Sequence, residues 1–174
     1  VGDEPFAVML PDDIMVDDGV LLRGMIDALQ QTGASVVALK EFPFSEISAY
    51  GCAAHGPSTP GSALVPINGL VEKPKAEEAP SNLAVMGRYV FTPAIFEHLA
   101  QIRPGVGGEI QLTDGIRAII GAEPVWGLLY RGRRFDCGTQ VGWLDANISL
   151  AMEHPALREV VLEAVRRCGE RNSI

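Results

Sequence analysis

Apolar and polar residues alternate along the start of the chain in a pattern that indicates an α/β fold. A short apolar run from Phe6 to Leu10 is closed by a polar turn, which is typical of a buried strand. Apolar residues then recur with helical spacing from Leu21 to Leu29, and Gly33 is placed to end that helix. A second β-rich run covers Ala34 to Leu39. This succession is a βαβ unit, which favours a parallel sheet.

The rest of the chain continues with strands, helices and loops. Turn residues predict a loop at 55–62, and a second, polar loop is expected at 76–82. The further strands that we predict are Ala63–Val71, Ala84–Phe91 and Val125–Tyr130. The further helices are Pro93–Ile102, Asp114–Ile120 with Thr113 as its N-cap, and two helices from Val141 onward that are separated at Pro155.

Composition and charge narrow the possible functions. Of 174 residues, 47% are hydrophobic and 21% are charged, so the chain is globular and can bury a core. A net charge of −8 argues against a nucleic-acid partner, which would require a positive surface. No apolar run approaches the length of a membrane span, so no membrane partner is expected either.

The cysteines and the N-terminus bear on location. The chain has three cysteines, Cys52, Cys137 and Cys168. An odd number without a CxxC pair argues against a disulfide framework or a zinc site. A reducing cytoplasm fits this pattern. The N-terminus lacks the segments of a signal peptide. It also lacks an initiator Met, which is compatible with a start inside a longer chain.

Two acidic residues come directly after the first predicted strand. Asp12 and Asp13 stand where ligands bind in open α/β sheets, and a carboxylate there could hold Mg²⁺ against a phosphate. The dipeptide alone favours the alternative, a solvated turn in which Asp13 caps the next element. Further along, Asp136 precedes a predicted helix and is a candidate for a second metal-facing carboxylate. Cys137 is interpreted as a small buried residue, because no histidine is well placed to activate it.

Candidate substrate-binding residues lie at the ends and in the middle of other predicted strands. Glu72 can accept hydrogen bonds from vicinal sugar hydroxyls, and Lys73 can offer a charge to a phosphate, although an exposed charged turn would look the same. Gly87 inside a strand indicates either the close approach of a ligand or a bulge, and Gly51 allows the same two interpretations. The stretch 107–114 has a sufficient structural interpretation as a glycine turn, a cap and an acidic helix N-terminus.

The order of these motifs closely resembles that of bacterial UTP–glucose-1-phosphate uridylyltransferases, from about residue 1 to about residue 154. The matching motifs are Leu10-Pro11-Asp12-Asp13, Tyr50-Gly51, Gly69-Leu70-Val71-Glu72-Lys73-Pro74-Lys75, Ala79-Pro80-Ser81-Asn82-Leu83-Ala84, Gly87-Arg88-Tyr89-Val90, Gly107-Gly108-Glu109-Ile110-Gln111-Leu112-Thr113-Asp114 and Phe135-Asp136-Cys137-Gly138-Thr139. Enzymes that make dTDP-glucose or ADP-glucose share the Glu-Lys-Pro and strand-glycine pattern. The run from Glu72 to Tyr89, together with the 107–114 stretch, indicates the uridylyl branch.

The resemblance implies a fold, a reaction and a set of site residues. The fold would be part of a Rossmann-like, glycosyltransferase-A-like mixed sheet flanked by helices, with a sugar- and metal-binding portion at 1–154 and a C-terminal helix at 155–174. Such enzymes are homo-oligomers that convert UTP and glucose 1-phosphate into UDP-glucose and pyrophosphate with Mg²⁺. By residue, the resemblance assigns Mg²⁺ to Asp12 and Asp136, glucose hydroxyls to Glu72, the sugar phosphate and a catalytic role to Lys73, and backbone contacts with the sugar to Gly51 and Gly87.

One departure from the family pattern limits what we expect of this chain. The family opens with a Gly-rich loop that carries an essential Arg and Lys, and nothing here matches it. We therefore expect the chain alone to be inactive and poorly stable, because Phe6–Leu10 would lack neighbouring strands. Two alternatives stay open: a sugar nucleotidyltransferase of the dTDP- or ADP-glucose type, and a non-catalytic domain that binds sugar phosphates.

Overall fold

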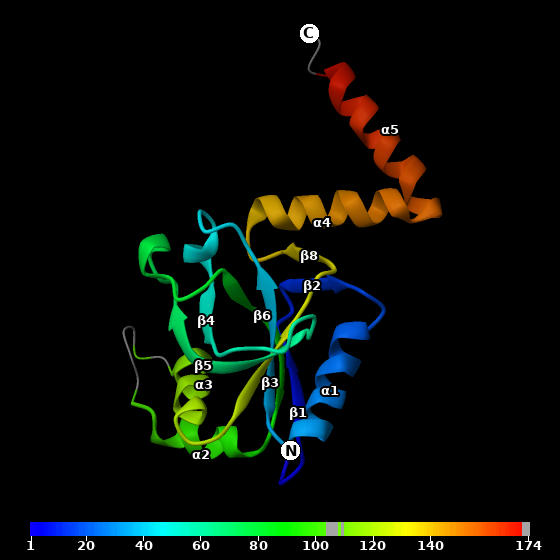
Figure 1. Ribbon diagram of the computed structural model, residues 1–174. Helices are drawn as coiled ribbons and strands as arrows, with labels where there is room; N and C mark the ends of the chain where they lie inside the picture. The colour runs from blue at the N-terminus through cyan, green and yellow to red at the C-terminus, as the bar shows by residue number, and fades with distance from the viewer. Residues whose placement is uncertain (104–107, 109, 172–174) are drawn as a thin grey trace. The chain divides into compact units, whose positions relative to one another are not determined.

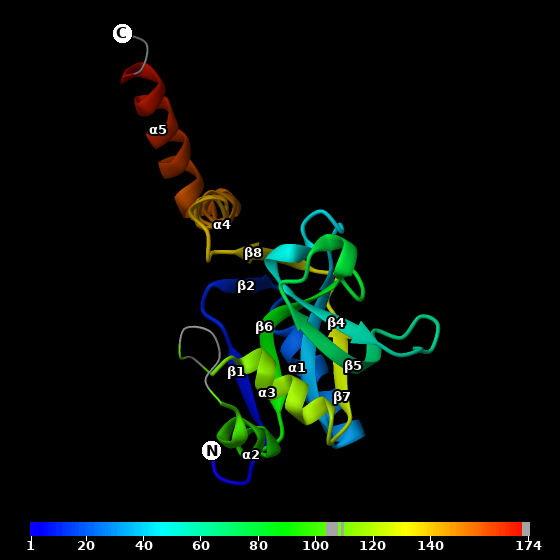
Figure 2. The same cartoon turned by 90° about the vertical axis from the view of Figure 1, so that its left-hand side faces the viewer.

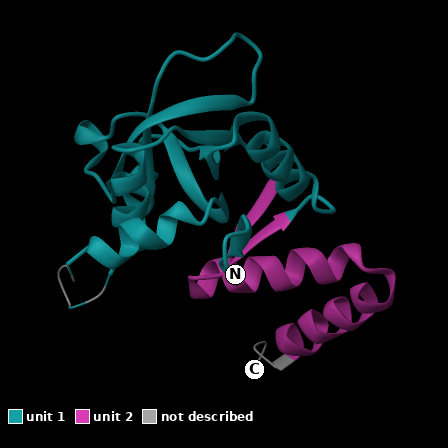
Figure 3. Ribbon diagram, turned by 90° about the horizontal axis from the view of Figure 1, so that it is seen from below, with its two compact units in different colours: residues 1–10, 16–132 teal, residues 11–15, 133–174 magenta. Residues whose placement is uncertain are grey.

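The computed structural model describes residues 1–103, 108 and 110–171. The predicted glycine turn at 107 and 108 falls partly outside these residues. Figures 1 and 2 show the chain in two views at right angles. It divides into two compact units, which Figure 3 colours separately: unit 1 is Val1–Leu10 with Val16–Gly132, and unit 2 is Pro11–Met15 with Arg133–Ile174.

Unit 1 is built on a six-stranded sheet with the strand order β1-β6-β3-β7-β5-β4. The strands are β1 (Phe6–Met9), β3 (Ser35–Glu41), β4 (Gly51–His55), β5 (Leu64–Glu72), β6 (Leu83–Phe91) and β7 (Val125–Leu129). Only the β3–β7 pair is parallel among the registers that the described residues give, while β6 runs antiparallel to β1, β3 and β4. Strands β1 and β3 of the predicted βαβ unit run in the same direction, but β6 lies between them and is antiparallel to both. The parallel sheet expected from the βαβ pattern is therefore wrong. The mixed sheet expected from the family resemblance is confirmed.

Helices cover both faces of this sheet. Helix α1 (Val20–Thr32) lies on one face, and α2 (Ala94–Gln101) with α3 (Leu112–Ile120) lies on the other (Figures 1 and 2). Helix α1 ends as the sequence predicts: Gly33 adopts a left-handed φ of 69°, and its N–H bonds to the carbonyl of Leu29. Two short 3₁₀ turns, η1 (Ile47–Ala49) and η2 (Ala76–Glu78), complete this unit.

The core of unit 1 fills the space between the sheet and α2–α3. Strand β3 is buried along most of its length, from Ser35 to Leu39, as expected for a strand with neighbours on both edges. Strand β1 lies at the sheet edge and pairs with β6, and its side chains alternate between half-buried and exposed. The buried strand predicted from the apolar run is therefore wrong, and so is the expectation that this strand would lack a neighbour. The core residues of α3 and the neighbouring strands include Val37, Leu39, Phe91, Ile95, Ile116 and Ile119.

Unit 2 consists of a two-stranded sheet and two helices. Strand β2 (Asp13–Val16) pairs with β8 (Arg133–Asp136), and α4 (Gln140–Glu153) and α5 (Pro155–Arg171) come after them. The side chain of Thr139 caps α4 by accepting a 3.0 Å hydrogen bond from the Gly142 N–H. The expected break at Pro155 is confirmed. The domain boundary at 154/155 stays a prediction, and both helices belong to unit 2.

Two local expectations were wrong. Helix α3 begins at Leu112 with Gln111 as its N-cap, so Thr113 lies in the first turn and is not the cap. Asp13 opens strand β2 and is buried, so it neither caps a helix nor sits in a solvated turn. None of the helices in the described part of the chain is both long and apolar enough to cross a membrane.

Candidate functional site

The end of β5 places Glu72 opposite Gly51 on β4. The two residues are partners in the antiparallel register, so Gly51 stands directly beside the glutamate. A Cβ built on Gly51 would lie 3.1 Å from Oε2 of Glu72, which is tighter than ordinary van der Waals contact. Oε2 also accepts a 2.8 Å hydrogen bond from Oγ1 of Thr113. Glycine at position 51 therefore leaves room for this carboxylate.

Lys73 has an unusual backbone conformation for a residue with a side chain. Its φ is 45°, in the left-handed region, and its N–H donates a 3.1 Å hydrogen bond to the carbonyl of Tyr50. A left-handed residue other than glycine costs about 1–2 kcal/mol, and such residues cluster at functional sites. Strand β5 ends at Glu72, so Lys73 is the first residue beyond it. The lysine is exposed and the next residue, Pro74, is buried.

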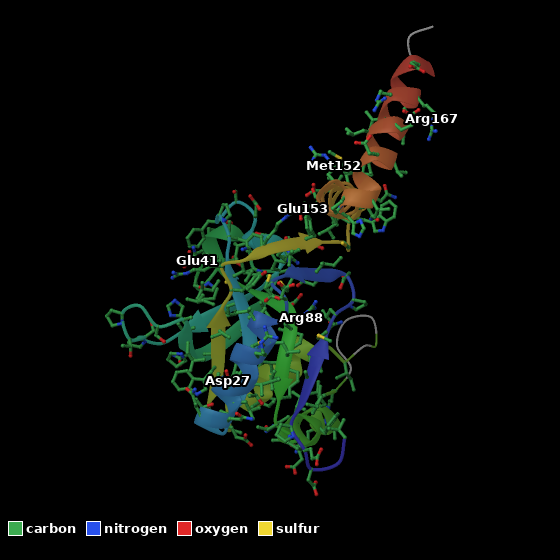
Figure 4. The ribbon with its side chains drawn as sticks, turned by 90° about the vertical axis from the view of Figure 1, so that its right-hand side faces the viewer. Asp27, Glu41, Arg88, Met152, Glu153 and Arg167 are labelled. Carbon is green, nitrogen blue, oxygen red and sulfur yellow. The ribbon has the colours of Figure 1, made fainter. Side chains whose placement is uncertain are left out.

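Gly87 lies in a bulge of β6. Val37 and Leu39 of β3 face Tyr89 and Val85, so Ala38 alone opposes the three residues of β6 between them. The bulge that the sequence offered as one interpretation of Gly87 is therefore confirmed. Its carbonyl accepts hydrogen bonds from the Leu10 N–H and from Nη1 of Arg88, each 2.9 Å long; Figure 4 labels Arg88 on this strand. The backbone contact between Gly87 and a sugar stays a prediction.

Gly51 and Gly87 are connected through β6. The Cβ built on Gly51 would lie 3.9 Å from Cβ of Val85, two residues before Gly87. Strands β4, β5 and β6 of unit 1 thus carry three of the four residues predicted to bind sugar and phosphate, Gly51, Glu72 and Gly87, and the fourth, Lys73, directly follows β5.

Unit 2 brings the two candidate metal ligands together around Gly138. A Cβ built on Gly138 would lie 3.0 Å from Oδ2 of Asp12 and 3.2 Å from Oδ1 of Asp136. The two oxygens are thus no farther apart than the sum of those distances, and only a glycine fits between them without crowding. The Gly138 N–H also donates to Oδ1 of Asp136, and the Cys137 N–H donates to the carbonyl of Asp12. Asp12 is exposed and Asp136 is half-buried.

Arg134 belongs to the same cluster, and sequence reasoning missed it. Its Nε donates to Asp13 at 2.6 Å, and its Nη2 donates to Asp136 at 3.1 Å. Asp13 is therefore a structural ion-pair partner, while Asp12 is the carboxylate that faces Asp136. One signal was available: Arg134 and Asp136 are two apart on a strand, and such residues share a face.

The two carboxylates around Gly138 can be compared with what a metal ion requires of its ligands. Among the described residues no group of three or more His, Cys, Asp or Glu side chains gathers as a metal site. Mg²⁺ is commonly held by one or two carboxylates together with substrate phosphates and waters. Two carboxylates around a glycine fit that pattern. They are too few to form a metal site without ligands from a substrate or water.

Cys137 differs from its predicted environment. It is half-buried rather than buried, and it lines a groove of about 560 Å³ in unit 2 together with His154. No hydrogen bond joins the two side chains in the described structure. The cysteine thus lacks the paired base that a nucleophile requires.

Comparison with known proteins identifies the family. The model of the nucleotidyl transferase family matches residues 1–152 of this chain. The chain belongs to the nucleotidyl transferase family. Two curated relatives in it are a UTP–glucose-1-phosphate uridylyltransferase 2 of Staphylococcus saprophyticus, 39% identical over 96% of this chain, and the UTP–glucose-1-phosphate uridylyltransferase YngB of Bacillus subtilis, 42% identical over 93%.

Solved structures of nucleotidyl transferases agree with this assignment. A UDP-glucose pyrophosphorylase complexed with UDP-glucose has a TM-score of 0.82 and 36% identity, over 88% of this chain and 58% of its own. A UTP-bound UGPase from Acinetobacter baumannii has a TM-score of 0.80 and 32% identity, over 94% of this chain and 56% of its own. The chain spans about half the length of the curated relatives it matches, 57% and 54% of the two named above.

Proposed function

We propose that this chain is the sugar- and metal-binding portion of a UTP–glucose-1-phosphate uridylyltransferase. The reaction joins glucose 1-phosphate and UTP: a phosphate oxygen of the sugar attacks the α-phosphorus of UTP, a new P–O bond forms, and pyrophosphate leaves. Catalysis of this kind relies on positioning and charge neutralisation rather than on covalent chemistry by the protein. The identity of 39–42% to uridylyltransferases supports the choice of this reaction.

In this proposal, unit 1 recognises the sugar phosphate. Glu72 accepts hydrogen bonds from glucose hydroxyls, and the backbone of Gly51 and Gly87 lies against the sugar. Lys73, which follows the strand end with a left-handed backbone, contacts the phosphate and neutralises part of its charge. The observation that carries the proposal is the Glu72 carboxylate, which is held beside a glycine at a strand end and is otherwise exposed.

Asp12 and Asp136 would hold Mg²⁺ in this proposal. The glycine between them is the feature of this structure that fits a small ion. When bound, Mg²⁺ would neutralise the charge of the phosphates. Arg134 orients Asp136 through its Nη2, so the carboxylate is fixed before a ligand arrives.

Steady-state kinetics with each substrate varied in turn test the function, on the protein as its gene encodes it. Glu72→Ala should raise the KM for glucose 1-phosphate far more than the KM for UTP, because its partners are sugar hydroxyls. Equal damage to both would assign Glu72 a structural role. A nucleotide panel that compares UTP, dTTP and ATP decides between the uridylyl branch and its two relatives, and turnover with none of them would favour a binding domain without catalysis.

We further propose a cytoplasmic homo-oligomer. The three cysteines form no disulfide among the described residues, which fits a reducing compartment. Helices α4 and α5 expose a set of large apolar side chains, and a surface of this kind is typical of an interface. The set comprises Val141, Trp143, Leu144, Ile148, Leu157, Val160 and Val165, each 44–79% exposed. The inactivity expected of the chain alone stays a prediction.

A further inference from the structure

Thr113 and Glu72 come from different elements and meet through a single hydrogen bond. Oγ1 of Thr113, in the first turn of α3, lies 2.8 Å from Oε2 of Glu72 at the end of β5. The residues are 41 positions apart in the chain, so no local turn geometry requires this contact. Because an ionised carboxylate can only accept, the threonine hydroxyl is the donor.

The helix that carries this hydroxyl is fixed against the core of unit 1. Ile116 and Ile119 on α3 are at most 1% exposed. Gly115 approaches α2 so closely that a Cβ on it would lie 2.6 Å from Cδ2 of Leu99. Thr113 is therefore presented from a rigid element, which is what a positioning group requires.

The two oxygens of Glu72 have different surroundings. Oε2 is confined between the Thr113 hydroxyl and Gly51. Oε1 accepts no hydrogen bond from any described residue, and the residue as a whole is exposed. A carboxylate that is hydrogen-bonded through one oxygen can no longer rotate freely. Its second oxygen therefore has a fixed orientation toward a ligand.

We propose that Thr113 is a positioning residue that orients the Glu72 carboxylate toward sugar hydroxyls. This inference rests on the proposed function, in which Glu72 binds those hydroxyls. An anchored carboxylate accepts from hydroxyls in one stereochemical arrangement, whereas a free one adapts to several. Thr113 therefore contributes to the choice of glucose 1-phosphate over its epimers, and it acts through Glu72 without touching the reacting atoms.

The test compares Thr113→Val, which keeps the shape and removes the donor, with Thr113→Ser, which keeps the donor. Both are made in the protein as its gene encodes it, alongside Glu72→Ala and the double variant. Thr113→Val should raise the KM and the calorimetric Kd for glucose 1-phosphate about five- to tenfold, which corresponds to the net contribution of one typical hydrogen bond. The KM for UTP should change by less than about twofold, a shift within the range of uncoupled sites.

Three further outcomes of this experiment would support the proposal. Thr113→Ser should restore the affinity. Thr113→Val should narrow the preference for glucose 1-phosphate over galactose 1-phosphate and mannose 1-phosphate. In the Glu72→Ala background, Thr113→Val should have no additional effect, since the group through which it acts has gone.

The failures are distinguishable. If Glu72→Ala loses glucose 1-phosphate while Thr113→Val binds it as wild type does, the role of Thr113 is wrong and the proposed function stands. If Thr113→Val weakens both substrates equally, or keeps its full effect without Glu72, the threonine is structural and the inference is overturned. If the unaltered protein does not bind glucose 1-phosphate, both the function and the inference are wrong.

Discussion

Arg134 donates a 2.6 Å hydrogen bond from Nε to Oδ1 of Asp13, and the two side chains are only 8% and 7% exposed. Arg134→Met should lower the free energy of unfolding of unit 2 by about 3–5 kcal/mol, because it leaves a buried carboxylate without its cation. Urea unfolding of the protein as its gene encodes it measures this loss: Trp143 in unit 2 reports on it in a background in which every other tryptophan, Trp126 included, is replaced by Phe.

The neighbouring arginine is the matched control. Arg133 pairs with Glu153 on α4, and these side chains are 41% and 55% exposed (Figure 4 labels Glu153). Arg133→Met should cost less than about 1 kcal/mol, as exposed ion pairs do. Equal costs for the two variants would show that the burial of Arg134 does not determine its contribution.

Asp12→Asn should remove most Mg²⁺-dependent turnover and leave the melting temperature nearly unchanged. Asp12 is exposed, so its carboxylate contributes little to the core, whereas the proposed ion needs the full negative charge. Asp13→Asn is the contrasting variant, since Asp13 is buried and paired, and it should lower the melting temperature. Circular dichroism melting and a magnesium titration of activity measure both effects. Near-wild-type turnover of pure Asp12→Asn protein would contradict the assignment of Asp12 as a metal ligand.

Gly51→Ala should weaken glucose 1-phosphate binding with little loss of stability. The new methyl group would stand 3.1 Å from Oε2 of Glu72, and the flexible glutamate can yield only by leaving its position. Gly69→Ala in β5 is the control, because its Cβ would meet Cβ of Ala54 at an ordinary 3.6 Å. Calorimetric titration with glucose 1-phosphate should separate the two variants. Indistinguishable affinities would mean that the space at Gly51 does not serve Glu72.

Association should depend on the apolar surface of α4 and α5. We expect the protein, as its gene encodes it, to be larger than a monomer by light scattering, and Trp143→Glu with Val160→Glu should lower its mass. These residues are 57% and 60% exposed and neither belongs to the buried core, so their replacement should cost little stability. Glu159→Lys, which changes an exposed charge on α5, should leave the mass unchanged. A monomer at micromolar concentration would refute the proposal.

The sequence predicted best those elements whose structure depends on residues within the element itself. Helix α1, its glycine cap and the start of α5 at Pro155 depend on local spacing and backbone preference, so the pattern alone predicts them. Strands β2 and β8 were missed because each has four residues of mixed polarity, and each is stabilised by the other across more than a hundred positions.

The candidate site shows the same division. Glu72, Lys73, Asp12 and Asp136 could be selected from strand ends and from the family resemblance. Thr113 could not be selected, because it reaches Glu72 only through the tertiary fold. Arg134 could be placed beside Asp136 from strand spacing, but only once residues 133–136 are recognised as a strand. The N-cap prediction for Thr113 also failed: Gln111 is the N-cap and the helix begins at Leu112, so the threonine hydroxyl in the first turn is available to Glu72.

The left-handed backbone of Lys73 implies a conflict between the stability of the fold and the proposed activity. Glycine or asparagine adopts φ = 45° at lower cost than lysine, so either residue at this position should make the fold more stable by about 1 kcal/mol. Selection for heat resistance alone would therefore accept the loss of the lysine, and with it the charge that we assign to phosphate binding. A lineage that keeps lysine here retains a conformation that folding alone would not choose, and position 73 is thus a place where sequence variation can distinguish active members of the family from thermally robust but inactive ones.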